Sequence, residues 1–498
     1  MGANLGDLFD LDKCGAQTVL IDCRLEHAPR YWTGAELKSE SNAYARALSG
    51  KGFAPGTRIA ILAANRAEYL AAYFGIMRAG LVAVPINTRV PASTVRYVIE
   101  DSGSRFAFVD SERQALCPDT LETLSFDDDE ALTGFLDPGD FPAISQPEDD
   151  VAMFLYTSGS TGKPKGVPLT HTGHHWVVRK RFQASIDYAK ERLLVAAPLY
   201  HMNALAMAKL AAYAGACIVL LPEFTATRYI QAIETFRCTW LTSVPTMLAK
   251  VVQERDLLDR TDLSSVTSVR MGSAPVTEHL IEQLTGIFTT ARIQVGYGTT
   301  EAGPCGFIPH PDGKPTPVLS LGVGDPEVNL RLVDANGQEA EQGVLEIACP
   351  ALMPGYHNLP EKTAAVMTGD GLYKTGDIMR RDADGFYFFV GRDDDMFVCN
   401  GENVYPEQVE RLIESHPDIA QACVVPVDDT VRGAMPVAFV VMRDDATIDA
   451  EQVKAHTIAN GPAYQHPRHV FFETELPLAG TNKLDRNRLQ EMAAERVT

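Results

Sequence analysis

The residues best suited to chemistry form one run, YTSGSTGKPKGV, which begins at Tyr156, the last residue of the apolar segment VAMFLY. Glycines and small hydroxyl residues leave backbone N–H groups free to surround phosphate oxygens, and the two lysines add positive charge. The run differs from the GxxxxGK[ST] loop of P-loop NTPases, because Gly159 and Gly162 are only three positions apart and Pro164 follows the first lysine. A flexible linker is the plain alternative, but a linker needs no buried strand before it. The run therefore predicts a phosphate-binding loop.

Apolar segments and segments with helical periodicity alternate on both sides of this loop. RIAILAAN, from Arg58, has the composition of a strand, AEYLAAYFGIMRAG, from Ala67, repeats apolar residues at helical spacing, and LVAVPIN follows as another strand. Further strands are predicted at RFAFVD, VAMFLY, RLLVAAPL and ACIVLLP, with helices at 205–214 and 227–236. This βαβ pattern predicts mostly parallel sheets covered by helices.

The pattern changes after about Asp377 to turns rich in Asp and Gly, short strands, a helix (EQVERLIESH) and a further strand (ACVVPV). This change predicts a smaller α+β domain at the C-terminus. We expect residues 1–392 to form the domain that binds AMP and substrate, and residues 393–498 to form the second domain. The acidic segment SFDDDEALTGFLDPGD, around Asp127, is expected to be a solvated loop.

The composition excludes several classes of protein. The 498 residues include 44 Lys and Arg against 65 Asp and Glu, and the net charge of -21 argues against a nucleic-acid-binding or anionic-membrane surface. Nine cysteines without a CxxC pair fit reduced thiols better than a disulfide framework. The sequence has no secretory leader pattern and no apolar stretch of about 18 residues. We therefore expect a cytoplasmic protein without a membrane span, either monomeric or homodimeric.

Six further segments, taken with the phosphate loop, resemble the adenylate-forming superfamily of acyl-CoA synthetases, peptide-synthetase adenylation domains and luciferases. In order, they are PLYHMNAL, RMGSAPV, VGYGTTEAGP, YKTGDIMRRDADGFYFFVGRDDD, NGENVYPEQVE and LPLAGTNKLDRNRL. The resemblance extends from about residue 30 to the end of the chain. It implies that family's α/β fold, with a large N-terminal body of parallel and mixed sheets covered by helices and a small, mobile α+β cap at the C-terminus.

The resemblance also implies ATP and Mg²⁺ as cofactors. Tyr297 would stack on the adenine ring, and Asp377 and Arg392 would hold the ribose hydroxyls. Glu301 and Thr161 would hold Mg²⁺, for which oxygen atoms are the preferred ligands. The expected nucleotide-binding residues are Thr157, Ser158, Gly159, Ser160, Thr161, Gly162, Lys163, Ser273, Ala274, Pro275, Tyr297, Gly298, Thr299, Thr300, Asp377 and Arg392.

Four residues are expected to be catalytic: Lys483, Glu301, His201 and Thr161. Lys483 matches the family's adenylation lysine, whose ammonium group would lie between the substrate carboxylate and the α-phosphate of ATP. Because these two groups are both anionic, their reaction requires charge neutralisation and alignment. His201 resembles the aromatic gate that closes between the two half-reactions.

The cap is expected to change position between the half-reactions. Asp394 matches the hinge, and Gly401 and Glu402 would border the path of coenzyme A, the expected acyl acceptor. The cap also departs from the usual pattern of the family, at Cys399, Asn400, Arg432 and Gln465. These departures leave the adenylation half of the reaction secure and the identity of the acceptor open.

Residues near the matched motifs are expected to line the acyl pocket: His201, Asn203, Ala204, Met207, Trp240, Thr242, Met271, Gly272 and Cys305. The apolar, methionine-rich segment MNALAMAKLAAY favours a medium, branched or aryl acid over a dicarboxylate. HTGHH, from His171, could suggest zinc, but it lacks a convincing set of ligands. We expect these histidines to pack at the start of a helix.

The sequence thus predicts an AMP-forming ligase that converts a carboxylic acid and ATP to an acyl-adenylate and then transfers the acyl group to coenzyme A. An amide bond synthetase, which uses the same adenylate with an amine acceptor, is the main alternative. A peptide-synthetase module is disfavoured because PLYHMN has no acidic residue to hold an amino group. A luciferase-like oxidation and a non-catalytic nucleotide sensor are weaker alternatives, the sensor because the catalytic set is intact.

Overall fold

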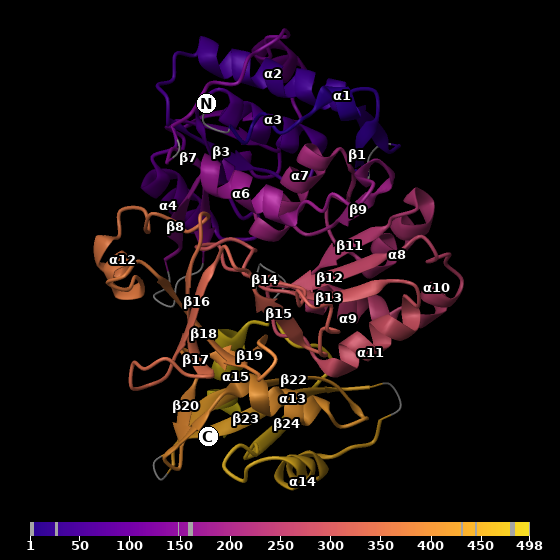
Figure 1. The fold of residues 1–498 in the computed structure, drawn as a ribbon, viewed down its shortest axis with the longest axis vertical. Coiled ribbons are helices and arrows are strands. Elements are labelled where there is room, and N and C mark those ends of the chain that lie inside the picture. Colours follow the sequence, from indigo (N-terminus) through magenta and orange to yellow (C-terminus); the bar gives the residue numbers. More distant parts are fainter. Residues whose placement is uncertain are drawn as a thin grey trace.

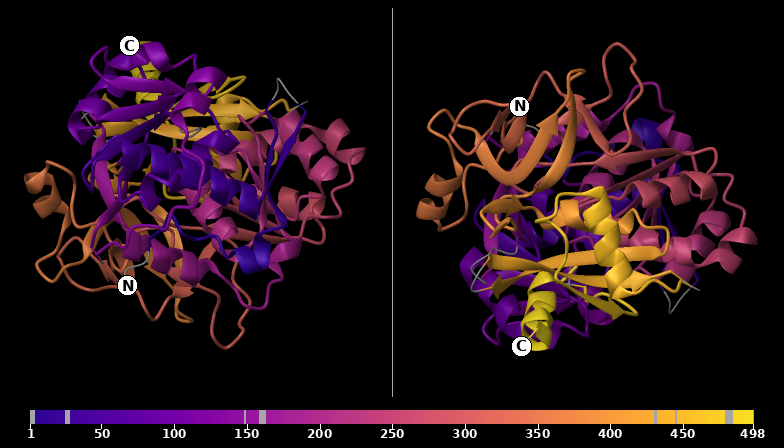
Figure 2. Two further views of the ribbon diagram at one scale, coloured as in Figure 1. Left: turned by 90° about the horizontal axis from the view of Figure 1, so that it is seen from above. Right: turned by 90° about the horizontal axis from the view of Figure 1, so that it is seen from below.

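The computed structural model describes residues 4–24, 28–147, 149–157, 163–429, 432–443, 446–478 and 484–497. They form a large body and a smaller C-terminal domain, the cap, which lies at the bottom of Figure 1. Figure 2 shows the orange and yellow elements of the cap in front of the body when the molecule is seen from below. The predicted α/β fold with a small α+β C-terminal domain is confirmed. The domain boundary at residues 392 and 393 remains a prediction.

Two sheets in the body are parallel except for one antiparallel edge strand each. The first, in the order β13-β12-β11-β9-β10-β1-β2, contains β13 (Arg292–Gly296), β12 (Ser268–Gly272), β11 (Trp240–Ser243), β9 (Arg192–Val195), β10 (Cys217–Leu220), β1 (Thr18–Asp22) and β2 (Arg30–Thr33). The second, in the order β6-β5-β3-β4-β7-β8, contains β6 (Glu122–Ser125), β5 (Phe106–Val109), β3 (Arg58–Leu62), β4 (Val82–Pro85), β7 (Val151–Thr157) and β8 (Lys165–Thr170). All six strands predicted in this region are present.

Helices join the two sheets into one core. Every residue of α3 (Ala67–Arg78) is buried, which explains why this helix is largely apolar on all its faces. The same hydrophobic cluster contains side chains of α2 (Gly34–Gly50), α6 (His171–Arg181) and α7 (Met202–Ala214). A second cluster packs further helices on the first sheet: α8 (Ala226–Phe236), α9 (Pro245–Gln253), α10 (Arg255–Asp259) and α11 (Glu278–Ile287).

An antiparallel sheet completes the body and adjoins the cap (Figure 1). Its strands are β14 (Phe307–Ile308), β15 (Ser320–Gly324), β19 (Phe386–Arg392), β18 (Tyr373–Arg381), β17 (Gln342–Ala348) and β16 (Asn329–Val333). The cap contains β20 (Phe397–Cys399), β21 (Glu402–Val404), β22 (Ile419–Asp429), β23 (Gly433–Met442), β24 (His469–Glu473), α13 (Pro406–Glu414), α14 (Ala450–Asn460) and α15 (Arg486–Val497). Within the described parts of the chain, every helix is too short or too polar to span a bilayer.

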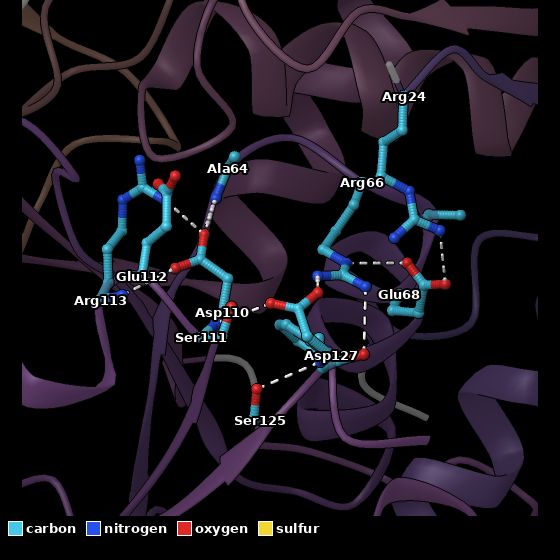
Figure 3. A network of polar contacts seen from close by, with 12 residues as sticks. Arg24, Ala64, Arg66, Glu68, Asp110, Ser111, Glu112, Arg113, Ser125 and Asp127 are labelled. Atoms are coloured by element: carbon cyan, nitrogen blue, oxygen red, sulfur yellow. Dashed lines mark hydrogen bonds and ion pairs between the residues drawn. The ribbon is translucent and has the colours of Figure 1, made fainter. Parts of the chain in front are cut away.

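The acidic segment around Asp127 is mostly exposed, as predicted, but it is not a plain loop, because Asp127 is anchored to the body. Asp127 accepts hydrogen bonds from Arg66 at 2.5 Å and from the Ser111 backbone at 2.7 Å. Buried Arg66 also pairs with Glu68 at 3.0 Å, and Figure 3 shows this network. The residues after Asp127 form the short helix α5 (Asp129–Phe135). The charge pattern of the segment could not reveal this, because its partner lies 61 positions earlier in the chain.

Candidate active site

A cavity of about 1200 Å³ lies where the first parallel sheet, the antiparallel sheet and the cap meet. Residues that the sequence assigned separately to nucleotide, metal and acid binding line this one cavity. They are Thr157, His201, Asn203, Thr242, Met271, Gly272, Ser273, Ala274, Pro275, Tyr297, Gly298, Thr299, Thr300, Glu301, Asp377 and Arg392. The fold thus brings together residues that lie as far apart in the sequence as Thr157 and Arg392.

The carboxyl ends of adjacent parallel strands form one wall. Gly272 and Gly296 are the last residues of β12 and β13 and pair in register. A Cβ atom on Gly272 would lie 2.3 Å from the Gly296 carbonyl oxygen, so a side chain cannot be accommodated there. Ser273 then takes a left-handed conformation with φ of 68°. Binding sites in open α/β sheets commonly lie at this edge, and the small residues here leave backbone groups accessible to a flat ring.

Asp377 and Arg392, expected at the ribose, face each other on the neighbouring strands β18 and β19. Arg392 Nη1 lies 2.8 Å from Asp377 Oδ1, and the Tyr297 hydroxyl donates to Asp377 Oδ2. Burial raises the pKa of Tyr297, so it stays a hydrogen-bond donor. Arg392 also donates to both oxygens of Asp394, at 2.8 and 3.0 Å. The expected ribose pair is therefore bonded directly to the expected hinge residue.

Buried Glu301 lies beside Tyr356, which the sequence analysis did not single out, and Tyr356 links it to Lys165, one of the two lysines of the predicted phosphate loop. The Tyr356 hydroxyl donates to Glu301 Oε1 at 2.9 Å, and Lys165 Nζ donates to the Tyr356 hydroxyl at 3.2 Å. Among the described residues, none places a cation within ion-pair distance of Glu301, so its carboxylate is free to hold one. Burial lowers the pKa of Lys165, which lines the cavity. Tyr356 lies outside every recognised motif, so the sequence carried no signal for it.

Lys163, the other lysine of the phosphate loop, does not line the cavity. Its ammonium group lies 5.1 Å from the centre of the Tyr97 ring. The rest of the expected phosphate loop, Ser158, Gly159, Ser160, Thr161 and Gly162, lies outside the described residues, and their roles remain predictions.

The expected acyl-pocket residues divide into two groups. His201, Asn203, Thr242, Met271 and Gly272 line the cavity, and the Thr242 hydroxyl donates to Asn203 Oδ1 at 2.9 Å. Ala204, Met207, Trp240 and Cys305 do not line it. Closeness in sequence failed for these four because the side chains of a helix or strand point to different faces, and theirs pack into the core of the body.

Two arginines that the sequence analysis missed also line the cavity. Arg181 is the last residue of α6, and Arg270 lies in β12 beside Thr242 of β11. Among the described residues, neither has a carboxylate within ion-pair distance. Arg270 belongs to the motif RMGSAPV, but the resemblance to the family assigned no role to it. Arg181 lies outside all motifs.

The cap closes the cavity from below. Lys483 lies outside the described residues, but Leu484, which follows it, pairs with Leu478 in a β-bridge and lines the cavity, as does Arg486. Gly401 and Glu402 line a separate hollow of about 450 Å³. Asn400 before them has a left-handed φ of 54°, where glycine is favoured. In this arrangement the cap presents Leu484 and Arg486, and not the Gly401 turn, to the cavity.

The histidines of HTGHH have structural contacts at the start of α6. His171 Nδ1 accepts from the Leu5 backbone at 3.1 Å, and His174 Nδ1 lies 3.1 Å from Lys209 Nζ. The His175 ring packs edge-on against Tyr213. These contacts agree with packing at a helix start.

Known proteins resemble this chain over nearly its whole length. The family model described as "AMP-binding enzyme" matches residues 11–357, and the model described as "AMP-binding enzyme C-terminal domain" matches residues 408–483. A feruloyl-CoA synthase from an Amycolatopsis species is 32% identical over 468 residues, which cover 92% of this chain and 94% of the relative.

Two solved structures have the same fold over both domains. The anthranilate CoA ligase AuaEII in complex with anthranoyl-AMP superposes with a TM-score of 0.89 at 25% identity, covering 99% of this chain and 98% of that chain. The amide bond synthetase McbA from Marinactinospora thermotolerans superposes with a TM-score of 0.86 at 25% identity, covering 98% of each chain.

Proposed function

Because this chain belongs to the family of AMP-binding enzymes, within the adenylate-forming superfamily, we propose that it is an AMP-forming carboxylate–coenzyme A ligase. One observation carries the proposal. A single cavity gathers the two adenine strips, the ribose pair, Glu301 and the cap residue that follows Lys483. The feruloyl-CoA synthase and anthranilate CoA ligase among the similar proteins support an acid–thiol ligase.

In the first half-reaction a carboxylate oxygen of the acid bonds to the α-phosphorus of ATP, and pyrophosphate leaves. Adenine binds between Ser273–Pro275 and Tyr297–Thr299, where small residues expose the backbone. Asp377 and Arg392 hold the ribose hydroxyls. Lys483 neutralises the charge where carboxylate and phosphate meet, and Lys165 is the loop lysine that we assign to the phosphates, since it lines the cavity.

The residues around Glu301 fit a magnesium ion. Its buried carboxylate carries a negative charge that no described cation neutralises, and Thr300 adds a hydroxyl oxygen nearby in the lining. Such oxygens are the ligands that Mg²⁺ prefers. Glu301, with Thr161 and Thr300, would hold the ion, which supplies positive charge to the phosphates.

In the second half-reaction the thiol sulfur of coenzyme A bonds to the acyl carbon, and AMP leaves. Gly401 and Glu402 face a separate hollow in this arrangement of the cap. We infer that the cap turns about Asp394 to bring them to the adenylate, and that His201 gates the change. Among the medium, branched or aryl acids expected from the sequence, aryl acids are favoured by the feruloyl and anthranilate relatives.

The test is AMP release from ATP with a panel of aliphatic and aryl acids, with and without coenzyme A. The ligase proposal expects AMP and acyl-CoA to rise together only when coenzyme A is present. Acyl-adenylate that accumulates without coenzyme A and is discharged by added amines would instead establish an amide bond synthetase. That second candidate rests on the similarity to McbA and on the unusual cap residues Cys399 and Asn400 beside the expected coenzyme A path.

A further inference from the structure

Arg181 and Arg270 form a pair of cations in the cavity wall without a compensating anion. Arg181 Nε is buried and has no hydrogen-bond partner among the described residues, and its Nη2 contacts only the weakly accepting Met207 Sδ, at 3.0 Å. The Arg270 guanidinium lies over the backbone of Gly296. No described carboxylate lies within ion-pair distance of either arginine.

Both arginines line the same cavity, and their like charges repel each other there. The charge of Arg181, followed by burial, lowers the pKa of Arg270 to about 9. Burial also lowers the pKa of Arg181. Asp325, a buried carboxylate in this part of the body, is engaged by Lys180 at 2.7 Å. A buried charge without a partner is costly, and two like charges side by side are more so. Binding of an anion to the two guanidinium groups would offset this free-energy cost.

The position of Arg181 and Arg270 in the cavity indicates which part of the substrate they would contact. Arg270 is the register partner of Thr242, whose hydroxyl binds Asn203, and both of these line the acyl side of the cavity. The nucleotide side has its own cations, Lys165 for the phosphates and Arg392 for the ribose. The arginine pair is therefore available to the acyl part of the substrate.

We propose that the acid substrate carries a second anionic group, a carboxylate or a sulfonate, which binds between Arg181 and Arg270 while the other carboxylate is adenylated. Guanidinium groups suit this role because they donate two parallel hydrogen bonds to such groups. This inference rests on the proposed ligase function and adds its substrate class. It replaces the preference against dicarboxylates, which rested on a segment whose Ala204 and Met207 do not line the cavity.

The test compares acids in matched pairs that differ only in the charge of the distal group. Suitable pairs are terephthalate with 4-carbamoylbenzoate, isophthalate with 3-carbamoylbenzoate and glutarate with glutaramate, and 4-sulfobenzoate separates sulfonate from carboxylate. The readouts are kcat/KM for AMP release with coenzyme A and the shift in Tm with a non-hydrolysable ATP analogue. In at least one pair we expect the dianion to be preferred roughly 100-fold, as charged hydrogen bonds permit.

Arg270→Gln and Arg181→Gln test the two partners separately, so that a folding failure of one leaves the other. Each is expected to reduce the preference for the dianion at least tenfold and to spare the amide-ended acid. Arg179→Gln, which removes an exposed arginine from the same helix, should keep the wild-type preference. Equal use of both members of every pair, or a preference unchanged in both variants, would overturn the inference.

Failure of the ligase function has a different signature. If no acid supports AMP release, the proposed function is wrong, and the Tm shift then decides the second point. A larger shift with the dianions that is lost in Arg270→Gln supports the anion site, and equal shifts within each pair refute it.

Discussion

Arg392 shows how single residues connect binding to movement in this protein. Its guanidinium bonds to Asp377, which we assign to the ribose, and to Asp394, which we assign to the hinge. Glu301 is the opposite case, because it lies buried in the cavity with a tyrosine hydroxyl but no described cation beside it. At this scale, Arg392 is already paired with two carboxylates, whereas Glu301 has no described cation within ion-pair distance.

Lys483→Ala tests the residue that we expect to carry most of the first half-reaction. Removing one preorganised charge costs on the order of 100- to 1000-fold in rate. We expect adenylate formation, measured by pyrophosphate release, to fall by that factor, while thioester formation from supplied acyl-adenylate stays close to wild type. Equal loss in both half-reactions would contradict the assignment.

Lys209→Met tests the cost of a buried cation behind the acyl pocket. Lys209 is fully buried, and burial, followed by the charge of Arg181, lowers its pKa from 10.5 to about 7. Between about pH 7 and 10.5 the unfolded chain binds this proton and the folded chain does not, so wild-type stability rises with pH in that window. We expect the variant to be more stable by about 1 to 3 kcal/mol at pH 7, with a smaller difference at pH 9.5.

Thermal or denaturant unfolding at the two pH values measures this difference. Lys190→Met is the control, because the Lys190 ammonium is exposed. A Lys209→Met advantage that is absent at pH 7, or that grows as the pH rises, would show that Lys209 is not a buried destabilising amine.

At the scale of elements, helix α13 holds the cap against strand β19 of the body. Arg411 on this helix donates to the carbonyl oxygens of Phe389 and Val390, at 3.2 and 2.5 Å. The two elements approach closely, since a Cβ on Gly391 would lie 2.9 Å from Glu407 Oε2. This contact stabilises the orientation in which Leu484 and Arg486 of the cap line the cavity.

Arg411→Ala removes these hydrogen bonds and is expected to loosen that orientation. Hydrogen bonds from a charged donor contribute about 1.5 to 3 kcal/mol. We expect the adenylation rate to fall roughly tenfold or more and thioester formation from supplied adenylate to be unchanged or faster. Arg488→Ala is a matched control, since Arg488 pairs only with Glu491 of its own helix among the described residues. A parallel loss in both steps would point to general instability of the cap.

At the scale of the whole molecule, one small domain must serve two reactions. The cap now presents the Leu484 side to the cavity, while the Gly401 turn lies in a separate hollow. Both cannot face the adenylate together, so we infer a rotation between β19 and β20, where Asp394 lies.

Asp394→Pro tests this rotation, because proline restricts the backbone at the hinge. We expect adenylation to be largely intact and thioester formation to be blocked, measured as separate half-reactions. Asp394→Ala is the necessary control, since it also removes the bonds to Arg392 but leaves the backbone free. Wild-type thioester turnover in Asp394→Pro would remove the hinge from the mechanism.

The sequence by itself, through its resemblance to the adenylate-forming superfamily, determined the enzyme class and the α/β fold, and it predicted the residues of a nucleotide site. These properties are carried by contiguous motifs, whose local chemistry, such as the small residues around Ser273 and the carboxylate of Glu301, is legible without the fold. The strands β3, β4, β5, β7, β9 and β10 were also predictable, because burial between helices requires continuous apolar runs.

Only the tertiary structure decided which side chains meet. It showed that Ala204 and Met207 pack into the core, that Asp127 is bonded to Arg66, and that Tyr356 reaches Glu301. It also brought Arg181 of α6 and Arg270 of β12 to one cavity, where no described carboxylate lies within ion-pair distance of either. The physical reason is that the free-energy cost of burying a charge depends on the groups around it. In a folded chain these groups come from distant parts of the sequence.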